Sequence, residues 1–222
     1  MSIGENERAT QDRVVNFFKD RDILDYEYLG NLKDATNKNI RGDRLRAYLR
    51  LSGYSQKLID GAVSQMVRAA DDMTHGLYDA NQKVYSLLKY GAKVAESPEV
   101  APKTVYFMDI ANPTNNDFAI AEEVTVVERH EKRPDIVIYL NGIAMVVIEL
   151  KKSSVSVSNG IRQNLTNQKE SFIAPFFTTM QLCMAGNEIE GLRYGTVLTG
   201  EKYYMEWKPD GFHENEDERD LE

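Results

Sequence analysis

Apolar residues recur every three or four positions in the first part of the chain, which is the spacing of amphipathic helices. We predict a first helix over residues 10–19 and a short strand at 26–29. Three more helices are predicted before residue 91, and Gly53 and Gly91 stand where helix-ending glycines are expected. The apolar positions of these three helices are Leu45, Tyr48, Leu49 and Leu51, then Leu58, Ile59, Val63, Met66 and Val67, then Val84, Tyr85, Leu87 and Leu88.

The pattern changes after Pro98, where runs rich in Val, Ile and aromatic residues predict strands. Asn141-Gly142 is a strong signal for a two-residue hairpin turn. Helices are predicted through Ile161 and Leu165 and over 172–180. The predicted strands cover residues 104–110, 118–127, 135–140, 143–149, 182–185, 196–198 and 203–207.

These elements predict an α/β or α+β protein in which a mixed β-sheet is flanked by helices. We expect a helical N-terminal region over 1–96 that packs on a core over 97–208. Residues 209–222 have little apolar content and a dense acidic run, which predicts a linker to a further part of a longer chain.

Composition indicates a soluble protein that can bury a core, because 42% of its 222 residues are hydrophobic and 28% are charged. The longest apolar run falls short of the roughly 20 residues that span a membrane. The polar start of the chain argues against a secretory signal, and the single cysteine, Cys183, excludes an internal disulfide. A cytoplasmic location is the expectation.

The net charge of −8 weighs against a protein that grips DNA unaided, because phosphate contacts usually demand a basic excess. It does not weigh against an enzyme whose DNA is delivered by another domain or subunit.

The residues that carry chemistry lie at the ends of the predicted hairpin. Asp135 opens one strand, and Glu149 and Lys151 close the other, so antiparallel pairing makes them neighbours. Side chains alternate along a strand, which puts Glu149 and Lys151 on one face and Leu150 on the other. The simpler interpretation is a structural salt bridge between Lys151 and the acids. Pro134, the tight turn and the apolar strand that leads into Glu149 favour a functional site.

Such a site suits Mg²⁺, which takes carboxylates, water and phosphate oxygens as ligands. Asp135 and Glu149 are the expected metal ligands, and the Leu150 carbonyl can add a third oxygen. The metal would polarise a phosphate and lower the pKa of a bound water. Lys151 would hold or help deprotonate that water and offset charge in the transition state.

At these residues the sequence resembles the PD-(D/E)xK nucleases, and more specifically the N-terminal nuclease domain of the type I restriction enzyme R subunit (HsdR). The resemblance extends over roughly 105–207 and more loosely over the helical N-terminus. It includes the segments 116–126, 141–144, 160–168 and 179–182.

The resemblance implies a restriction-endonuclease-like fold and Mg²⁺-dependent cleavage of double-stranded DNA. It also implies a helicase-type motor C-terminal in the same polypeptide, with methylation and specificity subunits as partners. ATP belongs to that motor, since this chain has no phosphate-binding loop motif. Gln163 matches the glutamine of the family's Gln-x-x-x-Tyr motif, whereas Asn167 stands at the tyrosine position.

Further residues are weaker candidates. Glu7 or Glu123 can add a metal ligand. An exposed glutamate at a helix start is the preferred interpretation of Glu7, and a solvated or paired strand carboxylate explains Glu123 equally well. Lys152, Arg162 and Lys169 can contact the DNA backbone, and ordinary surface solvation is the alternative.

Two other functions stay open on the sequence alone. One is a repair or mobile-element nuclease with the same core. The other is a docking module with little chemistry of its own, for which the helical segment 41–90 is suited.

Overall fold

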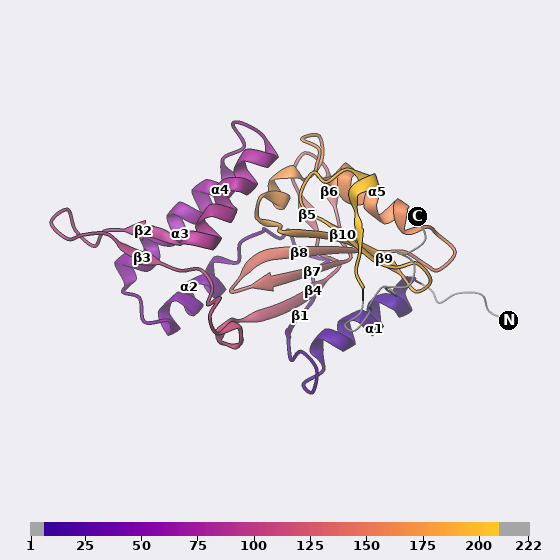
Figure 1. Cartoon of the computed structure of the whole chain (residues 1–222), viewed down its shortest axis with the longest axis horizontal. Coiled ribbons are helices and arrows are strands. Elements are labelled where there is room, and N and C mark those ends of the chain that lie inside the picture. The colour runs from indigo at the N-terminus through magenta and orange to yellow at the C-terminus, as the bar shows by residue number, and fades with distance from the viewer. Residues whose placement is uncertain (1–6, 209–222) are drawn as a thin grey trace, which may run out of the picture.

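The central feature of the protein is an antiparallel hairpin of β7 (Ile136–Leu140) and β8 (Ile143–Leu150) (Figure 1). The computed structural model describes residues 7–208, so the predicted acidic tail at 209–222 lies outside the described residues. Asn141 and Gly142 form the turn with φ values of 52° and 82°. Two consecutive positive φ angles are what a tight hairpin with a right-handed strand twist requires. This prediction is confirmed.

The hairpin forms the middle of a seven-stranded sheet with the order β1-β4-β7-β8-β9-β10-β11. The pairs β1/β4 and β8/β9 are parallel, and the other neighbours are antiparallel, which confirms the predicted mixed sheet. The flanking strands are β1 (Glu27–Asn31), β4 (Phe118–Glu122), β9 (Leu182–Asn187), β10 (Gly191–Gly195) and β11 (Met205–Glu206).

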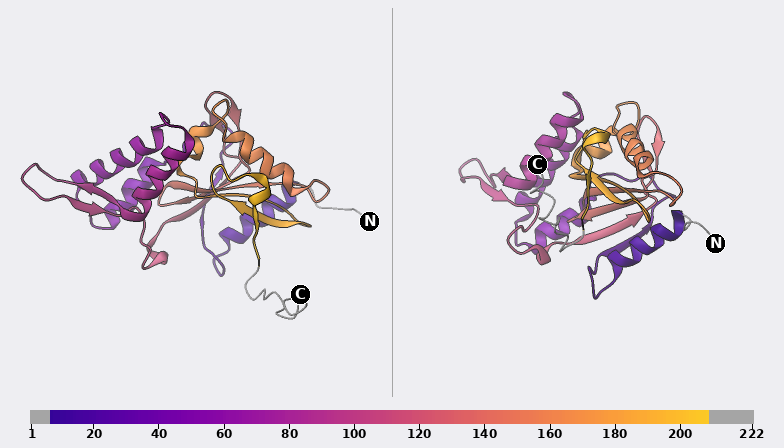
Figure 2. Two further views of the ribbon diagram at one scale, coloured as in Figure 1. Left: turned by 45° about the horizontal axis from the view of Figure 1, so that its top comes forward. Right: turned by 45° about the vertical axis from the view of Figure 1, so that its right-hand side comes forward.

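Helices cover the two faces of this sheet (Figure 2). On one face, α1 (Glu7–Lys19) packs Val15 against strand residues such as Ile120 and Ile148. On the other, α5 (Val157–Asn167) and the 3₁₀ helix η2 (Ala174–Thr179) bury Ile161 and Phe177. The strands are apolar toward both layers, so the hairpin is buried on both sides.

A helical layer with its own hydrophobic core lies beside one end of the sheet (Figure 1). A bridge between Ile40 and Ile143 and hydrogen bonds from Asn81 to the Thr178 and Met180 carbonyls connect it to the sheet region. The layer consists of α2 (Gly42–Leu51), α3 (Gln56–Asp71), α4 (Leu77–Tyr90), β2 (Ala92–Val94) and β3 (Lys103–Val105).

The expected boundary near 96/97 falls in the loop between β2 and β3, while β1, from the N-terminal side of that boundary, is a strand of the large sheet. The division into domains therefore stays a prediction. None of the helices in the described part of the chain is long and apolar enough to cross a membrane.

Several predicted elements differ from the structure. The single strand expected over 118–127 is divided at Glu123, which has a φ of 51°, into β4 and the short strand β5 (Val126–Val127) of a separate two-stranded sheet. The strand expected at 196–198 is a turn in which Leu198 has a φ of 62°, and the strand of this region is β10, just before it. The helix expected over 172–180 is the 3₁₀ helix η2, and the strand over 104–110 is reduced to β3. Burial of Val197 and Phe107 in the core, rather than strand pairing, explains the apolar residues that misled these predictions. The remaining short elements are η1 (Pro113–Asn115), β6 (Glu131–Lys132) and η3 (Glu201–Tyr203).

Candidate active site

Asp135 lies directly before β7, where Pro134 and the start of the strand set its backbone. Its side chain is almost buried, with the residue 9% exposed, and Oδ2 accepts a hydrogen bond of 2.7 Å from the backbone N–H of Leu150. Burial raises the pKa of Asp135 to about 6, although the Leu150 N–H and the charge of Lys151 act in the opposite direction. The hairpin thus brings this carboxylate to the end of β8.

Glu149, the penultimate residue of β8, is fully buried. Its Oε2 accepts a hydrogen bond of 2.5 Å from Gln163 Nε2, while Oε1 has no hydrogen-bond partner among the described residues. Burial, followed by the negative charge of Asp135, raises the pKa of Glu149 well above its usual range. Two carboxyl groups in one dry site cannot both carry a charge without a nearby cation.

Lys151 follows β8, and its backbone N–H donates to the Gly186 carbonyl of β9 at 2.9 Å. Its Nζ donates to the Leu150 carbonyl oxygen at 2.7 Å and lies 3.9 Å from Glu7 Oε1. The Leu150 side chain packs in the cluster that contains Val15 of α1. The Leu150 carbonyl oxygen, which we expect to bind the metal, is therefore at the site and accepts a hydrogen bond from the amine of Lys151.

Gln163 reaches Glu149 because α5 lies very close to the sheet. A Cβ atom on Gly160 would lie 3.0 Å from the Ala185 Cβ and 3.4 Å from the Glu149 carbonyl oxygen. One turn beyond Gln163, Asn167 is only 1% exposed, so the residue at the family's tyrosine position has no access to a DNA phosphate.

The donor set fits a hard divalent cation. Asp135 and Glu149 are adjacent carboxylates with raised pKa values, and Glu149 Oε1 is buried without a partner in the described part of the chain. Over residues 7–208 no group of three or more His, Cys, Asp or Glu side chains is placed to hold a metal ion. The protein thus offers two carboxylates and a carbonyl, a set that suits Mg²⁺ because this ion keeps several waters.

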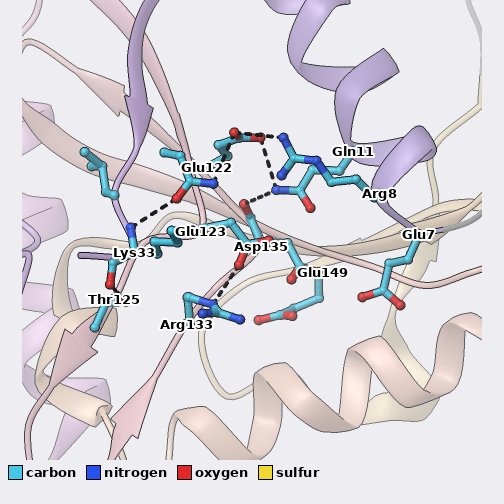
Figure 3. Close-up of polar contacts among 12 residues, drawn as sticks. Glu7, Arg8, Gln11, Lys33, Glu122, Glu123, Thr125, Arg133, Asp135 and Glu149 are labelled. Carbon is cyan, nitrogen blue, oxygen red and sulfur yellow. Dashed lines mark hydrogen bonds and ion pairs between the residues drawn. The ribbon is translucent and has the colours of Figure 1, made fainter. Parts of the chain in front are cut away.

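The two weaker acidic candidates lie near this pair but do not join it (Figure 3). Glu123 forms an ion pair of 2.7 Å with Arg133 Nε. Glu7 starts α1 and contributes, with Glu123, a small negative influence that raises the pKa of Asp135. Both carboxylates are therefore close enough to affect the pKa of Asp135.

The three basic candidates for DNA contact are exposed on the surface. Arg162 forms two hydrogen bonds of 2.8 Å with the Glu201 carboxylate, so a phosphate would have to compete with this partner. Lys152 directly follows Lys151, and Lys169 follows α5. Their role in DNA binding stays a prediction.

Sequence reasoning missed a buried polar network beside the site (Figure 3). Gln11 of α1 donates to both the Glu122 carboxylate and the Asp135 carbonyl oxygen, each at 3.3 Å. A usable signal was present: Gln11 is one helical turn beyond Glu7, and Glu122 ends an otherwise apolar strand. The local pattern could not predict that Gln11 and Glu122 form a hydrogen bond, because the two residues are 111 positions apart.

A mixed sheet flanked by helices, with buried acids at the end of its central hairpin, defines a restriction-endonuclease-like fold. A family model described as the type I restriction enzyme R protein N terminus matches residues 4–203. The chain belongs to this family.

Curated relatives are endonuclease subunits of type I restriction enzymes. The HindI endonuclease subunit of Haemophilus influenzae is 27% identical over 200 residues, which cover 83% of this chain and 18% of the relative. The SsaAORF53P endonuclease subunit of Staphylococcus saprophyticus is 30% identical over 97 residues, or 44% of this chain and 10% of the relative. The chain thus spans less than a fifth of the length of these relatives.

Proposed function

We propose that this chain is the nuclease domain of a type I restriction enzyme R subunit and hydrolyses phosphodiester bonds of double-stranded DNA with Mg²⁺. The observation that carries the proposal is the buried pair of Asp135 and Glu149, in which one carboxylate oxygen lacks a partner among residues 7–208. The negative charge of two buried carboxylates must be offset by bound protons or by a cation. The resemblance to the Mg²⁺-dependent PD-(D/E)xK nucleases favours the cation.

Asp135 and Glu149 hold the metal ion in this proposal. When bound, Mg²⁺ supplies Lewis-acid polarisation of the phosphate and a more acidic water. The Leu150 N–H fixes the rotamer of Asp135, and Gln163 fixes that of Glu149, so both carboxylates are oriented before the ion arrives. The Leu150 carbonyl oxygen would add a third ligand.

Lys151 positions the attacking water and stabilises the negative charge that develops on the phosphate. Its amine lies at the end of β8 and bonds to the Leu150 carbonyl oxygen, beside Glu7. From there the amine can donate a hydrogen bond to a water or phosphate oxygen bound beside Asp135 and Glu149. This role requires no basic surface on the domain.

The DNA is delivered by other parts of the enzyme. The net charge of −8 opposes unaided binding to a polyanion. We infer that a motor region in the same polypeptide, together with methylation and specificity subunits, brings the duplex to the site. ATP serves that motor and is not bound by this chain.

The decisive experiment compares native Lys151 with Lys151→Ala in the assembled restriction complex, with DNA cleavage and ATP hydrolysis measured in parallel. We expect cleavage to fall at least about a hundredfold, as for loss of a transition-state donor, with ATP hydrolysis unchanged. If a Glu149→Ala/Lys151→Ala double variant still cuts DNA in the complex, the domain is a docking module and the nuclease assignment is wrong.

A further inference from the structure

Glu122, the last residue of β4, is a buried carboxylate that the proposed chemistry does not use. We call its partners the Glu122 network. Burial acts to raise the pKa of Glu122, but hydrogen bonds from Arg8 and Tyr28 outweigh it and lower this pKa below its ordinary value. The donors are Arg8 Nη2 at 3.1 Å, Gln11 Nε2 at 3.3 Å, Tyr28 OH at 2.9 Å and Asn31 Nδ2 at 3.3 Å.

Gln11 extends this network to the active site. Its amide nitrogen, in a side chain that is only 3% exposed, also donates to the Asp135 carbonyl oxygen at 3.3 Å. The same carbonyl accepts the backbone N–H of Glu123 at 2.8 Å. The Glu122 network therefore joins α1 to the backbone of a proposed metal ligand (Figure 3).

The other contacts of α1 with the sheet region are an apolar cluster that centres on Val15 and two contacts at the surface. In the latter, Arg13 forms an ion pair of 3.4 Å with Glu188, and Lys19 lies 4.5 Å from the centre of the Tyr28 ring. Exposed contacts of this kind contribute little to holding a helix in place.

Apolar contact is non-directional, so it holds a helix on a sheet without fixing its position along the strands. Hydrogen bonds are directional and weaken steeply when distance or angle changes. Glu7 stands one turn before Gln11 on α1, hence the position of Glu7 beside Lys151 depends on the polar contacts of Gln11 and Arg8.

We propose that Gln11 and Glu122 are positioning residues of the catalytic centre. They fix α1 on the sheet so that Glu7 lies beside Lys151 and the Asp135 backbone is held in place, and they thereby set the affinity of the centre for a divalent cation. The proposal rests on the metal-dependent function proposed above. It assigns Glu7 an electrostatic effect on the site, whether or not its carboxylate contacts the ion.

The first test compares Gln11→Leu with Asn81→Leu in the 222-residue chain. Both changes replace a buried or half-buried amide that donates two hydrogen bonds, but Asn81 joins α4 to η2 instead of α1 to the sheet. Hydrogen exchange of the metal-free chain should show loss of protection confined to α1 in Gln11→Leu, and in α4 but not α1 in Asn81→Leu. Unchanged α1 protection in Gln11→Leu would overturn the proposal.

The second test measures Mn²⁺ affinity by titration, because Mn²⁺ takes the same oxygen ligands as Mg²⁺. Gln11→Leu and Glu122→Gln should each weaken binding about tenfold, as for other groups that orient metal ligands, and Asn81→Leu should not. In a Glu7→Gln background, Gln11→Leu should cause a clearly smaller further loss. Equal losses in both backgrounds, or unchanged affinity despite a loosened α1, contradict the positioning role.

The two proposals fail in different ways. A native chain that binds no divalent cation contradicts the metal-dependent function, and with it the role of the network in setting affinity. A native chain that binds Mn²⁺, with Gln11→Leu binding it equally well, contradicts the positioning role alone.

Discussion

The side-chain amide of Gln163 on α5 donates a 2.5 Å hydrogen bond to Glu149 on β8, although the two residues belong to different layers of the protein. The bond uses Oε2 of the carboxylate and leaves Oε1 without a partner in the described structure. Under the proposed function, Gln163 therefore selects which oxygen of Glu149 is left to bind the cation. This relationship gives the family's glutamine a physical task.

Replacing Gln163 with alanine should lower DNA cleavage by the assembled complex about 10- to 100-fold, the range for groups that orient metal ligands. ATP hydrolysis, which the motor performs in our proposal, should not change. Asn159→Ala is a suitable control, since Asn159 lies one turn earlier on α5 at an exposed position. Unaltered cleavage by the Gln163 variant would remove this residue from the site.

Glu149→Gln should stabilise the metal-free chain at neutral and alkaline pH. Asp135 and Glu149 have pKa values raised by burial, to about 6 for Asp135 and well above the usual range for Glu149. Their contribution to stability is complete below about pH 4 and is lost as the pH rises through these folded-state values. The variant should therefore be more stable than the native chain at pH 8 and differ little from it at pH 4. Urea unfolding in the presence of a chelator measures the free energy of unfolding of both chains at each pH. A difference between variant and native chain that is the same at pH 4 and pH 8 contradicts this prediction.

Cation binding should strengthen as the pH rises from about 5.5 to 8, because protons compete for the same carboxylates. Each bound ion should also release protons from the pair whose pKa values are raised. Titration calorimetry with Mg²⁺ in two buffers of different ionisation enthalpy counts these protons. Affinity that is independent of pH, with no proton release, would mean that the ion binds elsewhere.

Gly160→Ala should impair cleavage with little effect on folding. The added Cβ would lie 3.0 Å from the Ala185 Cβ, so α5 must move away from the sheet by a few tenths of an ångström and take Gln163 with it. The alanine also gains helix propensity of up to about 1 kcal/mol, which offsets the crowding. We expect a melting temperature close to the native value and roughly tenfold slower cleavage, as for a disturbed ligand-orienting group. Asn159→Ala, at the exposed neighbouring position, should leave cleavage at the native rate.

Gly142→Ala should destabilise the chain more than Gly30→Ala. Both glycines have positive φ, 82° and 96° respectively, so alanine is strained at either position. A Cβ on Gly142 would also lie 2.7 Å from the Arg41 carbonyl oxygen and 2.8 Å from the Leu45 nitrogen, whereas nothing lies within 4 Å of one on Gly30. We expect losses of about 1 kcal/mol at Gly30 from strain alone and of about 3 kcal/mol at Gly142 from strain with crowding. Chemical denaturation of both variants tests this order.

The central hairpin could be predicted because its signals are local. Asn141-Gly142 demands a tight turn, and the apolar strands on either side show that both are buried, so Asp135 and Glu149 had to meet at the far end. The place of Gln163 in the site was predicted from family resemblance and not from pattern, and its hydrogen bond to Glu149 was not predicted.

The tertiary part of the site could not be predicted in this way. Gln11 and Glu122 are 111 positions apart, and the local context of each residue does not identify the other as its partner. Similarly, Thr196 to Leu198 have strand-forming side chains, yet Val197 is used to fill the core from a turn. Local propensity is overridden wherever burial against a distant element decides the conformation.

The parts of the proposed catalytic centre come from segments far apart in the sequence, from α1 to Gly186, whose carbonyl accepts a hydrogen bond from the backbone N–H of Lys151. Contacts of such long sequence separation form late, after the intervening chain has been made. Under the proposed function, a nascent chain on the ribosome is therefore inert toward the DNA of the cell that produces it. The centre assembles only when translation has passed the ninth strand.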